Sequence, residues 1–187
     1  MTASTAEKIV ESFPYPTILP IIGQPTHETI AEVHSKLNAN AASVHSHRGN
    51  GQLGVLYLTL NPEVCNTLSN VLFELPVNPG QHPNIPEGST DPQAASVRKE
   101  HEERFNEFLT YDQTDKALKS LLITVVDESY IRSLRHKHRG YDNVKTITIL
   151  NHLYDSYARI TPIDLEENDK RLKESCDPNE AIETLID

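Results

Sequence analysis

Apolar residues recur every three or four positions along most of this chain, which is the spacing of one face of an α-helix. The clearest case lies between residues 142 and 160, where one face carries Thr146, Leu150, Leu153 and Tyr157. The same spacing predicts four earlier helices, with the following apolar faces: Ile30, Val33, Leu37, Ala41 and Val44; Val64, Leu68, Val71 and Leu72; Val97, His101, Phe105 and Phe108; Ile131 and Leu134. A further face at Leu118, Leu121, Leu122 and Val125 either continues the third of these helices or follows a restart near Thr114. We therefore expect an all-α fold with at least six helices.

Four of the predicted helices begin with the same signal, a capping residue followed by proline. The signal occurs at Asn61-Pro62, Asp91-Pro92, Thr161-Pro162 and Asp177-Pro178. Proline is tolerated there because the first helical N–H has no intrahelical partner in any case. The last two signals predict two short helices after residue 160, and the sequence stops about two turns into the second. Helices this short are marginal alone, so we expect the chain to be part of a larger protein.

Three segments lack helical spacing. Residues 1–25 hold Pro14, Pro16 and Pro20, which exclude a helix there and predict an extended segment lying either on its own domain or on a neighbouring molecule. Residues 55–60 alternate poorly and predict either a short strand or a buried helical turn. Residues 76–90 hold four prolines and two glycines, which predicts an exposed, mobile loop.

Composition and charge limit the partners and the cellular compartment to be expected for this protein. The chain has 187 residues, no tryptophan and a formal net charge of −10, so bulk charge does not favour wrapping of nucleic acid. No apolar run approaches the ~20 residues of a membrane span. The first residues lack the basic start and apolar centre of a signal peptide. The two cysteines form no motif. We therefore predict a reducing, cytoplasmic (intracellular) protein with no membrane partner.

One dense basic run stands out in this acidic chain. The predicted helix that Asp127 caps runs into it, and Gly140 closes it. The run consists of Arg132, Arg135, His136, Lys137, His138 and Arg139. Two interpretations remain open. The run is either a solvated helix end whose cations offset the helix dipole, or a contact site for a polyanion.

Other candidate chemistry is sparse. His45, His47 and Arg48 are expected in the last turn of the helix that begins at Thr26, with Gly49 as its cap. The alternative, half of a metal site at His45 and His47, lacks a third ligand nearby in sequence. Cys65 sits among apolar residues and is expected to be a buried, inert thiol. No hydrolase, metalloprotease, phosphate-loop or dinucleotide motif is present. We therefore expect no enzymatic activity, no cofactor and no catalytic metal.

Three stretches carry a family resemblance. They are LNANAASVHSHRGNGQLG, TDKALKSLLITVVDESYIRSLRHKHRGYDNV and HLYDSYARITPIDLEENDKRLKESCDPNEAIETLID. In this order they resemble the Gag polyprotein of copia-type retrotransposons, over residues 13–187. The zinc knuckle common in Gag proteins is absent from this sequence, because its three cysteines and histidine at close spacing are not found.

The resemblance implies a capsid-like structural protein that self-assembles into a particle around element RNA. Related capsids have two all-helical lobes. Residues 26–160 would then form the N-terminal lobe, and residues 161–187 the start of the C-terminal lobe. The partners implied are further copies of the chain and RNA, bound through assembly or through a segment downstream of this chain. The alternative is a capsid-derived helical module that binds a partner protein and forms no shell.

Overall fold

All regular secondary structure in the described part of the chain is helical. The computed structural model describes residues 5–158 and Lys170, so the predicted helices that begin at Thr161 and Asp177 lie outside it. Within these residues there is no β-strand, and a single isolated bridge pairs His136 with Gly140. The α-helices are α1 (Thr5–Ser12), α2 (His27–Ser43), α3 (Pro62–Leu68), α4 (Asp91–Val125), α5 (Glu128–Ile131) and α6 (Thr146–Tyr157). Three 3-10 turns join them: η1 (Arg48–Gly51), η2 (Leu56–Leu58) and η3 (Arg132–Leu134).

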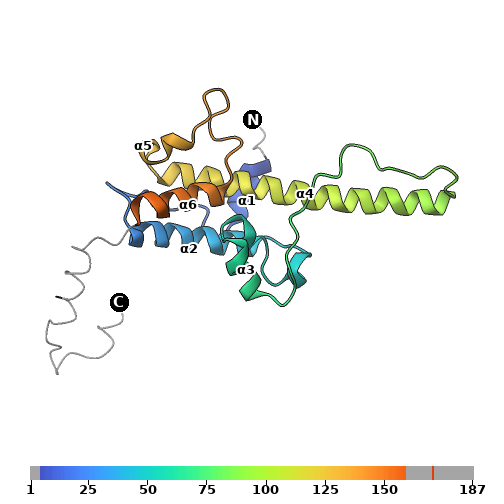
Figure 1. Ribbon diagram of the computed structural model, residues 1–187, viewed down its shortest axis with the longest axis horizontal. Helices are drawn as coiled ribbons and strands as arrows, with labels where there is room; N and C mark the ends of the chain where they lie inside the picture. Colours follow the sequence, from blue (N-terminus) through green and yellow to red (C-terminus); the bar gives the residue numbers. More distant parts are fainter. Residues whose placement is uncertain (1–4, 159–169, 171–187) are drawn as a thin grey trace, which may run out of the picture.

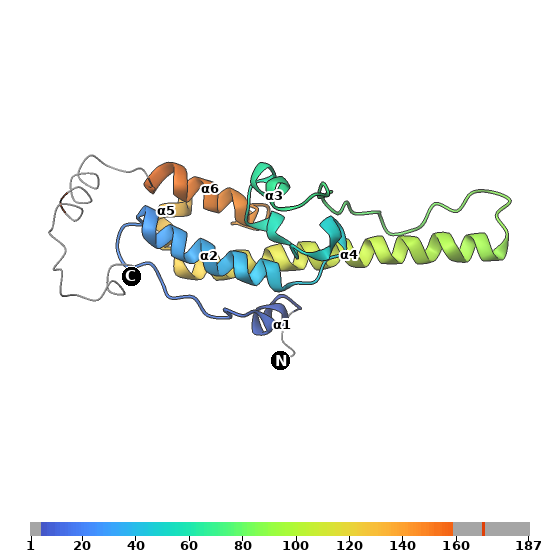
Figure 2. The same ribbon diagram turned by 90° about the horizontal axis from the view of Figure 1, so that it is seen from below.

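The core lies where α2, α6 and the C-terminal half of α4 run side by side (Figures 1 and 2). The predicted apolar faces of these three helices meet there. Their fully buried members include Ile30, Leu37, Leu118, Leu122, Leu150 and Leu153. Each buried side chain of this size contributes about 1.5–3 kcal/mol through the hydrophobic effect. The expected helices over residues 27–43 and 146–157 are confirmed, as is the N-cap Thr26, whose hydroxyl accepts the N–H of Thr29 at 3.3 Å.

The N-terminal segment is part of this core. The prediction of an extended segment over residues 1–25 is wrong for Thr5–Ser12, which form α1 and pack on α4. The prolines restrict the backbone only from Phe13 onward, so they leave this amphipathic stretch free to be helical. After α1 the chain is extended as predicted, and its Phe13 and Ile18 are buried in the core of the same molecule. The helical body therefore begins before residue 26, the boundary expected for the lobe.

Buried Asn40 of α2 fixes this extended segment in place. Its side-chain oxygen accepts the Tyr15 N–H, and its side-chain nitrogen donates to the Tyr15 carbonyl, both at 2.8 Å. Further along, the Ile21 N–H donates to the Val125 carbonyl at 2.8 Å. The segment thus lies on its own domain, the first of the two alternatives, while Leu19 and Ile22 remain exposed.

Helix α4 continues through Thr114 without a restart, and its N-terminal half projects beyond the core (Figures 1 and 2). Residues 69–90 contain no helix or strand and return alongside this projecting half. This was expected for the proline-rich residues 76–90, but not for the stretch that holds Val71 and Leu72. The stripe expected to be buried, Val97, His101, Phe105 and Phe108, is only half-buried because a single coil, and no second helix, runs beside it. Pairs such as Arg104–Glu100, at 2.6 Å and four residues apart, support the projecting half.

Two predicted helices end earlier than their apolar spacing indicates. Helix α2 ends at Ser43, because Val44 is extended and the Ala41 carbonyl is taken by the Val55 N–H at 3.0 Å. Gly54 makes this return possible: it has a φ of +53°, and a Cβ there would lie 2.4 Å from the Ala42 carbonyl oxygen. Helix α3 ends at Leu68 and buries only Cys65. The remaining predicted members of its apolar face are exposed: Val64, Leu68, Val71 and Leu72.

The segment between α2 and α3 settles one open alternative. Residues 55–60 contain η2, and Val55, Leu58 and Thr59 are buried around it. This is the buried helical turn and not the short strand. The two alternatives look alike in sequence because a short apolar run has too few residues to reveal its period.

Candidate functional site: a basic loop, an acidic groove and an apolar pocket

The basic run forms a loop and not the end of a long helix. Asp127 caps α5 as predicted, accepting the Ser129 N–H at 2.8 Å, but α5 and η3 together end at Leu134. His136 and Gly140 then pair through two backbone hydrogen bonds of 2.9 and 3.0 Å. A helix through this region would place Arg132, Arg135, His136 and Arg139 on one face, three and four positions apart. Like charges at this spacing destabilise a helix, which accounts for its early end.

The basic loop, residues 132–140, projects from the body beyond α5 (Figure 1). All six predicted contact residues are exposed: Arg132, Arg135, His136, Lys137, His138 and Arg139. Arg135 pairs with Glu128 at 3.1 Å and Arg139 with Asp142 at 3.0 Å, and all four side chains are more than half exposed. Such surface pairs neutralise little. Within residues 5–158, neither Arg132 nor Lys137 has an ion-pair partner, so the loop keeps a positive field.

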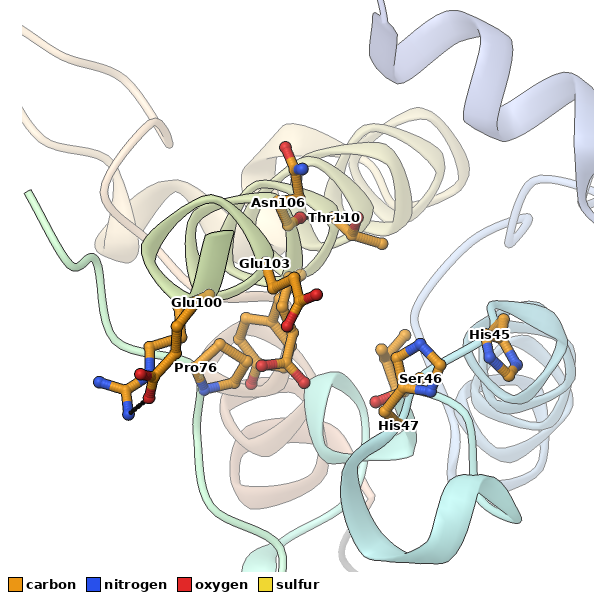
Figure 3. Close-up of a pocket in the computed structure, with 12 residues that line it drawn as sticks. His45, Ser46, His47, Pro76, Glu100, Glu103, Asn106 and Thr110 are labelled. Atoms are coloured by element: carbon orange, nitrogen blue, oxygen red, sulfur yellow. Dashed lines mark hydrogen bonds and ion pairs between the residues drawn. The ribbon is translucent and has the colours of Figure 1, made fainter. Parts of the chain in front are cut away.

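A groove of about 730 Å³ lies on another part of the molecule, between the projecting half of α4 and the segment that follows α2 (Figure 3). We call it the acidic groove, because α4 presents Glu100, Glu103 and Glu107 to it against the single guanidinium of Arg104. Their spacing of three and four residues places these carboxylates on one helix face. His45, Ser46 and His47 form the opposite wall (Figure 3). The other lining residues are Val55, Pro76, Asn106, Thr110 and Tyr111.

The three groove carboxylates are not equally available. Arg48 of η1 donates from Nε and Nη2 to the two oxygens of Glu107, both at 2.8 Å, and this hydrogen bonding raises the pKa of the Arg48 guanidinium. Glu100 pairs with Arg104 at 2.6 Å, and Glu103 pairs only with Lys99, at 3.8 Å. The Glu103 side chain is 67% exposed. Glu103 is therefore the carboxylate most open to an incoming cation.

His45 and His47 belong to the wall of this groove. Their ring centroids lie 4.7 Å apart with the rings nearly perpendicular. The prediction that they complete the last turn of a helix is wrong, because α2 ends before them. Among the described residues, no group of three or more His, Cys, Asp or Glu is arranged to hold a metal ion.

An apolar pocket of about 500 Å³ was not predicted from the sequence. It forms where η2, α3, the coil after α3, α4 and α6 meet, and Phe73 stacks on Tyr57 in its wall with ring centroids 3.7 Å apart. Burial raises the pKa of the Tyr111 hydroxyl at this site. The complete lining is Tyr57, Leu58, Leu60, Pro62, Asn66, Phe73, Leu75, Pro76, Phe108, Tyr111, Asp112, Asp115, Lys145 and Ile147.

Asp115 gives this pocket a buried carboxylate. The residue is only 3% exposed, accepts the Thr146 N–H at 3.1 Å and lies 3.6 Å from the Lys145 ammonium. One sequence signal could have pointed to it. Asp115 stands three residues before Leu118 on the core face of α4, and a carboxylate is rare at such a position unless it is paired.

Exposed apolar residues adjoin the pocket. They lie on α3 and on the coil after it, which also supplies Phe73 and Leu75 to the pocket wall. We call the following exposed residues the apolar surface: Val64, Leu68, Val71, Leu72, Leu75 and Val77. Leu72 is 74% exposed and Val77 78%. Large exposed apolar residues grouped in one short stretch of the chain favour an interaction site.

Cys65 is fully buried, as predicted, and burial raises the pKa of its thiol. The basic loop lines neither the acidic groove nor the apolar pocket. No helix in the described part of the chain combines the length and the apolar character needed to cross a bilayer.

Comparison with models of protein families, with curated proteins and with solved structures finds no match for this chain. The likeness to copia-type Gag is thus carried by the three sequence stretches alone.

Proposed function

We propose that this chain is a structural, capsid-like protein of the copia-type Gag class, which self-assembles around element RNA in the cytoplasm and has no enzymatic role. The resemblance of the three sequence stretches supports the family. The all-helical body is compatible with it. The observation that carries self-association is the apolar surface, which is exposed beside the apolar pocket.

Exposure of the apolar surface to water favours association of the chain. Six large aliphatic side chains between 41% and 78% exposed are costly to hydrate, and each one buried in a contact gains about 25 cal/mol per Å² of apolar area. Because α3 buries only Cys65 in its own molecule, its outward face is free to pack against another chain. A shell needs such a surface on every copy.

The test is concentration-dependent assembly, measured by sedimentation velocity and electron microscopy. Leu68→Ser combined with Leu72→Ser should abolish association without unfolding the chain, since both side chains are largely exposed. Leu19→Ser combined with Ile22→Ser is the matched control, because it removes two exposed apolar residues at a distant site. If the parent stays monomeric at every concentration, with and without RNA, the proposal fails.

A second function is favoured by one specific observation, the apolar pocket with its buried Asp115. Its volume falls in the range of sites that take a ligand or a few side chains. A capsid-derived module that binds a partner protein and forms no shell would use this pocket. A monomer that binds an apolar peptide, and loses it on Leu75→Ser, would support this function over assembly.

A further inference from the structure

We propose that the basic loop of one copy docks into the acidic groove of a second copy, head to tail. This inference rests on the proposed self-association and identifies a contact that directs it. It uses a different surface from the apolar one, so the two can be tested separately.

The basic loop and the acidic groove carry opposite charges. Between residues 132 and 139 the loop carries four permanent cations and no acid, while the chain as a whole carries a net charge of −10. Copies of so acidic a protein repel one another unless a positive patch on one meets a negative patch on the next. The basic loop is the dense positive patch of the described surface. The acidic groove offers it the carboxylates of Glu100 and Glu103, opposed by the guanidinium of Arg104.

The basic loop and the acidic groove both hold charged side chains that are available to a second chain. In the loop, Lys137 has no ion-pair partner among the described residues, and the pairs of Arg135 and Arg139 are exposed. In the groove, Glu103 is held only by Lys99 at 3.8 Å. Exposed pairs of this kind are worth little, so they can be exchanged for contacts with a second chain at small cost. Glu107, in contrast, is already bound through both oxygens by Arg48 and serves as a wall.

The contact can form only between two copies of the chain. Figure 1 shows the basic loop on one side of α4 and the η1–α3 region, which flanks the groove, on the other. A copy therefore cannot fill its own groove with its own loop. Because loop and groove are different surfaces, the contact between copies is heterologous, and repetition of it yields a closed ring or an open filament.

The acidic groove has room for the tip of the basic loop. The groove volume of about 730 Å³ suits a few long side chains from a loop tip. Because the contact joins opposite charges near the surface, it should weaken as salt is added.

The experiment exchanges the charges. The loop-reversed chain carries Lys137→Glu and Arg139→Glu, and the groove-reversed chain carries Glu100→Lys and Glu103→Lys. Sedimentation velocity at low salt should show each alone associating about tenfold more weakly than the parent. An equimolar mixture of the two should regain association, because each supplies the surface that the other has lost. Lys8→Glu with Arg98→Glu is the control with the same net charge as the loop-reversed chain, and it should associate better than that chain does.

A site-specific readout accompanies this. A carbodiimide, which joins an amine to a carboxylate by an amide bond with loss of water, should link Lys137 of one copy to Glu103 of another. Isotope labelling of half the molecules identifies the link as intermolecular.

Each outcome decides a different point. Loss in the single reversals with recovery in the mixture supports the contact. If the parent associates and the reversals behave as the control does, the loop–groove contact is wrong while the proposed self-association stands. A parent that never associates overturns both. A parent that associates only after addition of RNA, with a loop-reversed chain that fails to associate even then and no recovery in the mixture, would assign the loop to a polyanion and overturn the contact.

Discussion

The buried carboxylate of Asp115 on α4 accepts the backbone N–H of Thr146 at 3.1 Å and so caps the first turn of α6. The Thr146 hydroxyl in turn donates to the backbone carbonyl of Asp115, also at 3.1 Å. One turn along α4, the ammonium of Lys119 donates to the Asp142 and Val144 carbonyls at 2.8 and 2.9 Å. Desolvation of this ammonium by burial lowers the pKa of Lys119, and nearby Asp115 opposes that shift.

Removal of this capping carboxylate should destabilise the fold. We expect Asp115→Ala to cost about 3 kcal/mol, because it leaves a buried N–H unpaired and a buried ammonium without its counter-charge. Urea unfolding measures the loss. Lys145→Ala is the control: the Lys145 side chain is 55% exposed, so its loss should cost under about 1 kcal/mol. Equal unfolding midpoints for Asp115→Ala and the parent would show that the contact does not hold α6.

A charge placed in the core face of α6 should unfold the protein. Leu150 and Leu153 are 0% and 1% exposed. A buried, unpaired carboxylate costs several kcal/mol, comparable to the roughly 5–15 kcal/mol that stabilise a whole domain. Leu150→Asp or Leu153→Asp should therefore lose the helical circular dichroism signal at room temperature. Thr148→Asp, on the exposed face of the same helix, should melt close to the parent.

Loss of the Asn40 amide should release the extended N-terminal segment. Asn40 is fully buried and makes both of its hydrogen bonds to Tyr15. We expect Asn40→Ala to cost about 2 kcal/mol and to speed hydrogen exchange over residues 13–22. Asn38→Ala is a matched control on the same helix, because the buried Asn38 side-chain oxygen has no hydrogen-bond partner in the described structure. If exchange over residues 13–22 is as slow in Asn40→Ala as in the parent, Asn40 does not fasten the segment.

Stability should fall in mild acid because of His34. Its Nε2 lies 2.9 Å from the Thr59 carbonyl, which can only accept, and its Nδ1 lies 3.1 Å from the Tyr154 hydroxyl. Desolvation lowers the pKa of His34, although the Thr59 carbonyl opposes the shift. The unfolded chain therefore binds this proton more readily, with a pKa of about 6.5. The contribution of His34 to folding stability is present above that pH. It is lost as the pH falls toward the lower pKa of the folded state.

The measurement for His34 is the unfolding free energy across the acid range. His34→Gln should flatten the decline below pH 6.5 or so, whereas His82→Gln, at an exposed coil position, should leave it as in the parent. An unchanged decline in His34→Gln would place the pH dependence elsewhere.

Local information in the sequence was enough for the all-α class and for the helices that form the core. Thr26 and the spacing from Ile30 to Ala41 predict α2, and Thr146 to Tyr157 predict α6, because helix period and cap chemistry involve only neighbours a few residues apart. The buried Cys65 and the cluster of basic residues were also readable, since both depend on composition over a short window.

The tertiary structure decided which surfaces meet. Nothing local distinguishes the apolar face of α3, which stays exposed, from that of α2, which is buried, because the difference is whether another element covers it. The acidic groove joins α4 to residues 45–47, and the apolar pocket brings Tyr57, Asp115 and Ile147 together across some ninety positions of sequence. The helix expected through the basic run gave way to a loop. Repulsion among its cations and the pairing of His136 with Gly140 outweighed a weak local preference, and only the folded chain sets that balance.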